Sequence, residues 1–235
     1  GNVDWSKAIT QRKFMSQSSP RILFVKPPDR FLENEFVYQQ LGPHYLQSFL
    51  ERHNIPSDLA VFYERATTRR ARELDSSVNP SLDDLDVLLI KADGTHHDVP
   101  FDEAILGDYD VVAMSVMTPQ APDAYLLNEV IRKHHSRITS VIGGSHPRYY
   151  QEQVVNLPEA IRFDFVVPQD GWHPMLQIAT YQVKKSEKTQ VLCDSLPRLL
   201  DIPAPTRPQQ LMERYNFEIG GAPAFHTITA LGCPF

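Results

Sequence analysis

Short apolar runs alternate with segments of helical periodicity along most of this chain. The runs are rich in β-branched residues and stop at proline, glycine or polar residues, as strands buried in a parallel sheet do. We expect strands over residues 21–26, 58–63, 86–91, 109–115, 138–142 and 163–167, and helices over 41–50, 122–135, 148–156 and 172–181. Strands that alternate with helices over this length predict an α/β fold with a doubly wound, mostly parallel sheet and helices on both faces.

One part of the chain departs from this alternation. The run 86–91 leads to Asp93-Gly94, a favoured two-residue hairpin turn, so residues 96–99 are expected to return as an antiparallel edge strand. Before that run, residues 64–83 are charged and are expected to form a surface helix or loop. We expect the arginines of this stretch to make up a solvated helix face; they are Arg65, Arg69, Arg70 and Arg72.

Composition limits the classes of partner. The 235 residues carry a formal net charge of −6, which disfavours a surface for nucleic acid. No apolar run approaches the roughly 20 residues that cross a bilayer, and no signal peptide is visible, so we expect no membrane partner and a cytoplasmic location. With Cys193 and Cys233 as its two cysteines, the chain has no disulfide framework.

The two ends of the chain differ from its middle. The region after residue 185 is rich in proline, which fits neither a helix nor a central strand, and it carries a short helical pattern at 209–215 and a turn at Gly220-Gly221. In order along the chain, we expect an N-terminal arm (1–19), the α/β domain (20–185), a proline-rich C-terminal linker (186–224) and the start of a further strand (225–235).

Ligands of an open parallel sheet bind at the carboxyl ends of its strands, where the winding reverses. The loops expected there combine rigid prolines, hydroxyls that can hydrogen-bond to amide or nucleotide groups, and paired glycines that let backbone approach a ligand. The candidate ligand-binding residues are Pro27, Pro28, Phe31, Ser115, Met117, Thr118, Gly143, Gly144, His146, Gln169, Asp170 and Gly171.

Each of these candidates also has a structural interpretation. Ser115 and Thr118 are alternatively helix-capping residues, and His146 is alternatively a turn histidine. No Gly-x-Gly-x-x-Gly or Gly-Lys-Ser/Thr loop follows a predicted strand, so dinucleotides and nucleoside triphosphates are poor candidates for the ligand.

The order of these motifs resembles that of a known family. It comprises Pro-Pro after the first strand, Gly42 opening a helix, Tyr109-Asp110-Val111-Val112 before a Ser-x-x-Thr loop, Gly-Gly-x-His-Pro, and an acidic-Gly turn. This set is similar to the cobalamin-binding domain that precedes the barrel in cobalamin-dependent radical S-adenosylmethionine enzymes. The resemblance covers roughly residues 20–185 and implies a Rossmann-like, flavodoxin-like domain with cobalamin as its ligand.

The C-terminal Gly232-Cys233-Pro234-Phe235 resembles the start of the CxxxCxxC loop of the same enzymes. In that family three cysteines bind irons of a 4Fe-4S cluster, and S-adenosylmethionine binds the fourth iron. The resemblance implies that Cys233 is the first cluster ligand in a longer parent protein, with the radical S-adenosylmethionine barrel following it. The alternative interpretation is a buried cysteine beside a turn-forming proline.

Two departures from the family pattern bear on how cobalamin would be held. Gln169-Asp170-Gly171-Trp172 stands where the family commonly has Gly-Glu-Gly-Glu, which affects the expected contact with the nucleotide tail. The sequence also lacks Asp-x-His-x-x-Gly, the motif by which methionine-synthase-like domains supply a histidine to cobalt. The resemblance therefore implies that the dimethylbenzimidazole of cobalamin is swung away from cobalt. It also implies that protein covers the lower face of the corrin ring without supplying a histidine ligand.

The leading functional hypothesis is a cobalamin-binding module of a radical S-adenosylmethionine enzyme, a methyltransferase acting on an unactivated carbon. On this hypothesis the chain binds cobalamin but turns nothing over without the barrel. Two alternatives stay open. One is a stand-alone regulatory or sensor domain that binds cobalamin in the same pocket; the other is a Rossmann-like enzyme for a small substrate, with Asp170 or His146 as acid or base.

Overall fold

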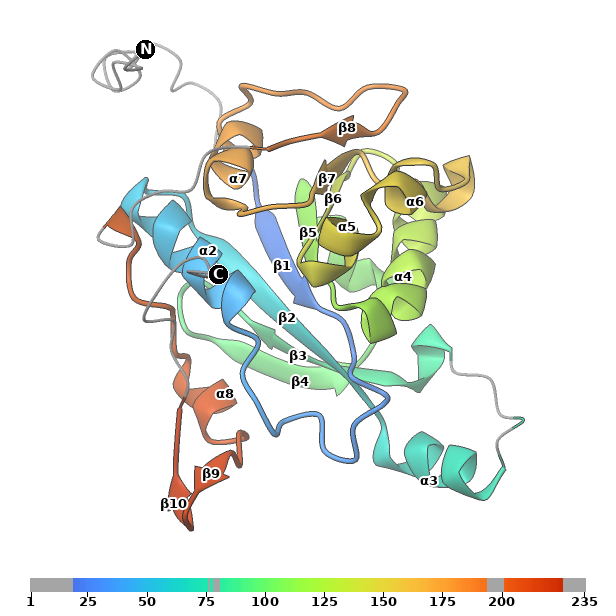
Figure 1. Ribbon diagram of the computed structural model, residues 1–235, viewed down its shortest axis with the longest axis vertical. Helices are drawn as coiled ribbons and strands as arrows, with labels where there is room; N and C mark the ends of the chain where they lie inside the picture. Colours follow the sequence, from blue (N-terminus) through green and yellow to red (C-terminus); the bar gives the residue numbers. More distant parts are fainter. Residues whose placement is uncertain (1–18, 76, 78–80, 194–200, 226–235) are drawn as a thin grey trace.

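The computed structural model describes residues 19–75, 77, 81–193 and 201–225. Within these residues the chain forms an eight-stranded sheet with helices on both faces (Figure 1). The strands are β1 (Ile22–Lys26), β2 (Ser57–Glu64), β3 (Leu85–Ile90), β4 (His96–Pro100), β5 (Val111–Ser115), β6 (Thr139–Gly143), β7 (Phe165–Val167) and β8 (Gln190–Val191). The helices are α2 (Leu41–Arg52), α3 (Ala66–Leu74), α4 (Ala121–His134), α5 (Ser145–Tyr149), α6 (Gln151–Val155), α7 (Trp172–Ala179) and α8 (Gln209–Met212).

The strand order is β4-β3-β2-β1-β5-β6-β7-β8. The strand β1 pairs in parallel with β2 on one side and with β5 on the other, so that Val25 lies between Ala60 and Met114. The winding therefore reverses between β1 and β5, which is where an open α/β sheet leaves a crevice for a ligand. The doubly wound, mostly parallel sheet predicted from the sequence is confirmed.

The edge formed by β3 and β4 is antiparallel, as the Asp93-Gly94 turn predicted. The strand β3 runs antiparallel to β2, and β4 runs antiparallel to β3, with Val87 opposite Val99. Gly94 has a φ of 87°, a conformation that glycine adopts without the steric cost that a β-carbon would add. All of β4 is exposed, so this hairpin forms one margin of the sheet.

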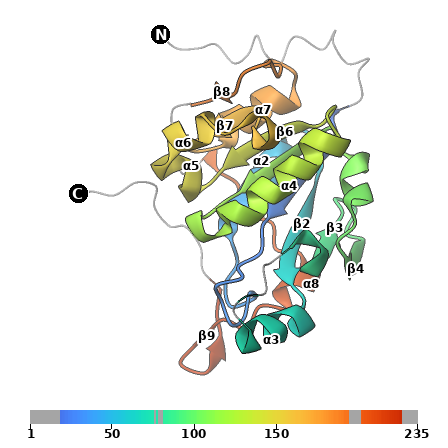
Figure 2. The ribbon, with the colours of Figure 1, turned by 90° about the vertical axis from the view of Figure 1, so that its right-hand side faces the viewer.

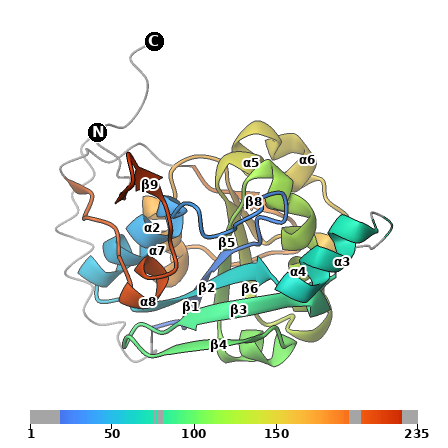
Figure 3. The same cartoon turned by 90° about the horizontal axis from the view of Figure 1, so that it is seen from below.

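Two apolar cores lie between the sheet and the helices, one on each face of the sheet. On one face, Phe49 of α2 and Met175 of α7 pack over the sheet, and on the other face Leu127 of α4 and Val154 of α6 do so. Figures 2 and 3 show α4 lying across one side of the strands and α2 with α7 on the other side. Burying each large apolar side chain of this kind contributes about 1.5–3 kcal/mol, so both helix layers are bound mainly by these contacts.

The helix predicted at 148–156 differs from the structure at its start and in its middle. It begins at Ser145 and is broken at Tyr150 into α5 and α6. The earlier start is possible because Gly144, with φ of 96°, turns the chain directly from β6 into α5. The short strand β8 was not predicted as part of the sheet; it pairs in parallel with β7 at Phe165 and Val166.

The expectation of a solvated arginine face on α3 is wrong for most of its members. The Arg69 guanidinium lies 2.5 Å from the Glu35 carboxylate, and Arg72 lies 2.6 Å from Glu64, whose side chain is fully buried. Arg65 pairs with Asp86 at 3.1 Å, and Arg70 alone of the four stays exposed. The local sequence does not reveal these partners because Glu35 and Glu64 come from other elements.

The C-terminal segment 201–225 packs against α2 and the adjoining loop. Its Leu211 is completely buried, and the Thr206 hydroxyl lies 2.9 Å from Nδ1 of His44. The predicted Gly220-Gly221 turn is confirmed, with φ values of 61° and 78°; it joins β9 (Glu218–Ile219) to β10 (Ala222–Pro223). No helix in the described part of the chain is long and apolar enough to cross a membrane.

Candidate ligand-binding site

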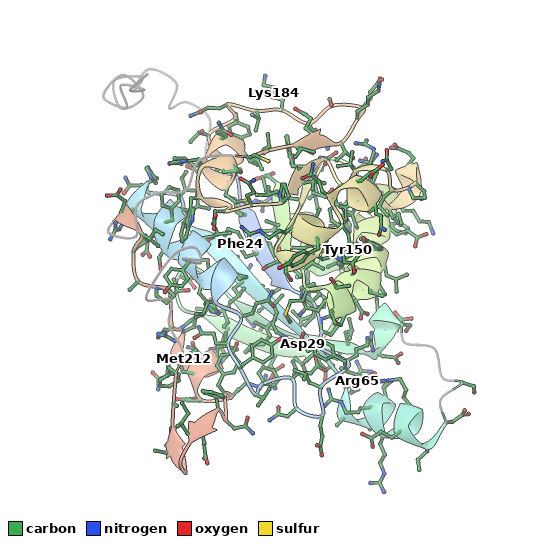
Figure 4. All side chains as sticks on the ribbon, in the orientation of Figure 1. Phe24, Asp29, Arg65, Tyr150, Lys184 and Met212 are labelled. Carbon is green, nitrogen blue, oxygen red and sulfur yellow. The ribbon has the colours of Figure 1, made fainter. Side chains whose placement is uncertain are left out.

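A cavity of about 280 Å³ lies between α2 and α7 over the carboxyl ends of the parallel strands. Its floor is apolar and includes Phe24 of β1 and Val141 of β6. Its walls are Tyr45 and Leu46 from α2, and Trp172 and Met175 from α7. Figure 4 shows Phe24 near the centre of the molecule, beside α2. The position matches the crevice expected where the winding of the sheet reverses.

Glycines narrow the cavity by letting its walls come close together. A β-carbon on Gly171 would lie 3.3 Å from Leu46, so glycine allows the start of α7 to approach α2. A β-carbon on Gly42 would lie 3.4 Å from the Ser115 hydroxyl. The cavity between the two helices is therefore narrow, and its mouth lies at the carboxyl ends of the strands.

Several predicted residues lie at this mouth. The cavity is lined there by Ser115, Gly143, Gly144, Gln169, Asp170 and Gly171, from three strand-end loops. The Ser115 hydroxyl accepts a hydrogen bond of 3.0 Å from Nε2 of Gln40, which also donates to the Ser115 carbonyl. Loops that are far apart in the sequence thus meet at one edge of the sheet, as the predicted topology requires.

Other predicted residues do not line the cavity, and His146 is one of them. It is buried on the α4 side of the sheet, where Nε2 lies 2.7 Å from the Tyr125 hydroxyl and Nδ1 lies 3.3 Å from the Thr118 hydroxyl. Burial lowers the pKa of His146 and favours the neutral ring. Both ring nitrogens are therefore engaged, and the hydroxyl of Thr118 belongs to this same cluster.

The predicted residues Pro27, Pro28, Phe31 and Met117 lie outside the cavity as well. The Pro27 carbonyl accepts a hydrogen bond of 3.1 Å from the Gln120 side-chain amide. The same amide donates a hydrogen bond of 2.6 Å to the buried Asp29 carboxylate. The sulfur of Met117 accepts a 3.7 Å hydrogen bond from the hydroxyl of Tyr38. Phe31 is 52% exposed.

A buried ionic network supports the loop between β1 and α2. Lys26 and Asp29 form an ion pair of 2.6 Å, and both side chains are almost completely buried. Next to them Arg30 binds Asp123 at 2.9 Å and Glu64 at 3.0 Å. Figure 4 shows Asp29 beyond the end of β1, on the side toward α3. These pairs hold the loop in one conformation beside the cavity.

Sequence reasoning missed most of the residues that line the cavity, and three of them illustrate why. Tyr45 reads as an ordinary core residue of a helix, and Arg148 as an ordinary surface residue. Trp172 stands out only as a departure from the family pattern. In the structure its indole Nε1 is buried and has no hydrogen-bond partner among the described residues. Arg148, at the mouth, forms no ion pair within the same part of the chain.

Cys233 lies outside the described residues, as does the expected strand before it from residue 226 on. Cys193 is an exposed free thiol. Among the residues that the structure describes, no group of three or more histidine, cysteine or acidic side chains could hold a metal ion. The cavity itself combines apolar walls with a polar mouth.

Comparisons with known proteins bear on the middle of the chain. Residues 77–179 match the family described as the B12 binding domain, which supports a cobalamin-binding domain. No curated protein matches the sequence. Among solved structures, the chain is similar to a DUF4886 family protein from Bacteroides uniformis, at 14% identity and a TM-score of 0.32. That similarity covers 54% of this chain and 49% of the other, so this chain spans about half of that protein's length.

Proposed function

We propose that this chain is the cobalamin-binding module of a cobalamin-dependent radical S-adenosylmethionine enzyme, and that the enzyme is a methyltransferase. The observation that carries the binding proposal is the glycine-narrowed cavity between α2 and α7, at the point where the sheet reverses its winding. The family match over residues 77–179 supports the same ligand. The enzyme class rests on the order of the loop motifs and on Cys233.

The size and lining of the cavity fit one part of cobalamin. At about 280 Å³ the cavity is slightly smaller than the roughly 300–1,000 Å³ of ordinary ligand pockets. It can therefore enclose the nucleotide tail, while the corrin ring stays outside at the strand ends. Apolar walls from Tyr45, Leu46 and Met175 suit a flat benzimidazole. Arg148 at the mouth suits the negative charge of the phosphodiester that links the tail to the ring.

The residues at the mouth would hold the ring side of the ligand. Ser115 has a hydroxyl positioned by Gln40, and Gly143 and Gly144 line the mouth beside it. Asp170 and Gln169 add polar groups that can bond to corrin side-chain amides. We assign no cobalt ligation to His146, because both of its nitrogens already contact hydroxyl groups. When bound, methylcobalamin supplies the methyl group for transfer.

The catalytic part of the proposal concerns the parent enzyme. Cys233 would be the first ligand of its 4Fe-4S cluster, and S-adenosylmethionine would bind that cluster. A C-terminal barrel would bind the substrate, and the enzyme would work in the cytoplasm. Reading the coding sequence beyond residue 235 tests this directly. Two further cysteines at CxxxCxxC spacing from Cys233 are expected. A sequence without them would favour a stand-alone regulatory or sensor domain.

Cobalamin binding itself is tested with the full chain. After incubation with hydroxocobalamin and desalting, the protein should retain the visible absorbance of one cobalamin per chain. Gly143→Val places extra atoms at the cavity and should abolish retention. Gly107→Val is the matched control, because a β-carbon at Gly107 makes only ordinary contacts with His135, away from the cavity. Wild-type protein without bound cobalamin, or equal retention by both folded variants, would refute the proposed site.

A further inference from the structure

The face of the sheet that lies under α2 and α7 has a hollow made by small side chains. Strand pairing places Phe24, Ala113 and Val141 in one row across β1, β5 and β6, and the next row toward the mouth contains Ser115 and Gly143. All five residues line the cavity. Ala113 is therefore flanked by two larger side chains in its own row, and the row between it and the mouth is small as well.

The helices that cover the sheet leave this hollow open. Leu46 of α2 and Met175 of α7 line the same cavity as Ala113, so they do not fill the space over it. Apolar walls that stay in contact with water contribute nothing to stability, because the favourable term comes from burying them. Packing alone would favour a larger, β-branched residue at position 113 of a strand. The hollow is therefore better explained by a ligand that fills it.

The floor of the cavity limits the chemistry of the group that can rest on it. Phe24, Ala113, Val141 and Val167 form this floor, and none of these side chains has a polar atom. Their strands are paired with neighbouring strands of the sheet, which engages the backbone groups. A ring that turns nitrogen atoms or an amino group toward this floor loses hydrogen bonds to water and gains none. A ring that turns methyl groups toward it gains from their burial.

We propose that the hollow over Ala113 receives the two methyl groups of dimethylbenzimidazole, and that it makes the chain selective for cobalamin over corrinoids with another base. The inference rests on the proposed function, since it names the form of the ligand that the same site prefers. An unmethylated benzimidazole would leave the hollow empty. Adenine would turn ring nitrogens and an amino group toward it. Ala113 is thus a specificity-determining residue of the site.

The first test titrates the full chain with three corrinoids that share one ring system and differ in the base. Hydroxocobalamin should bind about tenfold more tightly than its analogue with unmethylated benzimidazole, the effect of burying two methyl groups. The analogue with adenine should bind at least about tenfold more weakly than hydroxocobalamin, the effect of one buried polar group without a partner. Calorimetric titration gives the three dissociation constants.

The second test fills the hollow with Ala113→Val. Hydroxocobalamin should lose its tenfold advantage, whereas the unmethylated analogue should bind within about twofold of the wild type. Without ligand, the variant should unfold at a higher urea concentration than the wild type, because valine covers apolar surface that alanine leaves open. Ala60→Val is the matched control: Ala60 is completely buried on β2 and packs on the opposite face of the sheet. It should keep the wild-type preference and unfold more easily, as overpacked cores do.

The outcomes distinguish this inference from the proposed function. If wild-type protein binds none of the three corrinoids, the proposed function fails. If it binds all three with equal affinity, or if Ala113→Val keeps the wild-type preference, only the role of the cavity floor fails. A preference lost equally in Ala60→Val would also overturn the inference, because the effect would then not belong to the hollow.

Discussion

Gly144 approaches Val116 so closely that a β-carbon built on the glycine would lie 2.7 Å from both the nitrogen and the carbonyl oxygen of Val116. The two segments are joined by hydrogen bonds on either side, from Val116 N to the Gly143 carbonyl and from His146 N to the Val116 carbonyl. The loops after β5 and β6 are thereby bound together at the mouth of the cavity.

Gly144→Ala should therefore be severely destabilising. The φ of 96° costs an L-residue about 1–2 kcal/mol, and the contact with rigid backbone adds a further 1–3 kcal/mol or so. Gly94→Ala is the matched control, because φ is 87° there but no atom lies within 4 Å of the added carbon. Urea unfolding should show the larger loss for Gly144→Ala; equal losses would mean that the loop moves aside without cost.

Glu64→Gln should cost about 3–5 kcal/mol of unfolding free energy at neutral pH. The carboxylate is fully buried and accepts hydrogen bonds from Arg30 at 3.0 Å and from Arg72 at 2.6 Å. A neutral amide would leave Arg72 without an ion-pair partner among the described residues, and Arg30 with Asp123 alone. The exposed Glu129→Gln on α4 should change stability little.

The same residue also predicts a pH dependence. Burial opposes ionisation of Glu64, but hydrogen bonds and charge from Arg72 and Arg30 outweigh it and lower its pKa. The stabilisation is thus complete above the pKa of about 4.3 in the unfolded chain and falls as the pH drops below it. The difference between wild type and Glu64→Gln should shrink below pH ~4; a constant difference would contradict the ionised state.

His44 predicts a second acid sensitivity, in a higher pH range. Burial, followed by the charge of Arg207, lowers the pKa of His44 to about 3. The unfolded chain, with an ordinary histidine pKa of about 6.5, binds the proton more readily, so stability is complete above pH ~6.5 and decreases as the pH falls toward 3. Between pH 7 and 5 the loss from this one residue is about 2 kcal/mol.

His44→Asn should remove that part of the pH dependence while still offering a polar group to Thr206, which lies 2.9 Å from the imidazole. Stability measured by urea unfolding at several pH values should therefore decline less steeply in the variant. His97→Asn, on the exposed strand β4, serves as the control. Parallel curves for wild type and His44→Asn would argue against a neutral His44.

Leu211→Ala should loosen the C-terminal segment from the domain. Leu211 is completely buried against the core that includes Phe49, and truncating such a leucine typically costs 2–5 kcal/mol, here about 2 or more. Limited proteolysis should cut the variant faster within residues 209–216. Ile219→Ala, at a position 67% exposed, should be cut at the wild-type rate. Unchanged cleavage of Leu211→Ala would mean that the polar contacts of Arg214 with Asp98 suffice to hold the segment.

Much of the fold could be predicted because its strands and helices are locally encoded. The predicted strand 21–26 and the observed β1 differ by one residue, and the predicted helix 122–135 corresponds to α4 at 121–134. The start of α5 at Ser145 and the strand β8 could not be predicted. The first depends on how Gly144 meets Val116, and the second on pairing of the polar Gln190 with Phe165 across a long connection.

The sequence predicted at which edge of the sheet the candidate site lies, but not which side chains of the loops face the cavity. Ser115 and Gly143 line the cavity, whereas His146 comes from the same loop as Gly143 and faces α4 instead. A motif indicates which loop a residue occupies, but the side to which a side chain points depends on the rotation of the chain as it leaves the strand. Trp172 was missed as a cavity residue for a related reason: which side chains line a cavity is visible only when all their neighbours are in place.

By itself the sequence determined the alternation of strands and helices, and with it the parallel sheet whose loops converge at one edge. Those features follow from local periodicity and from the handedness of crossovers. Only the tertiary structure decided that the cavity opens between α2 and α7, that the arginines of α3 neutralise Glu35 and Glu64, and that the Trp172 N–H is enclosed without a partner. These depend on contacts between residues far apart in the chain, and no local pattern specifies such contacts.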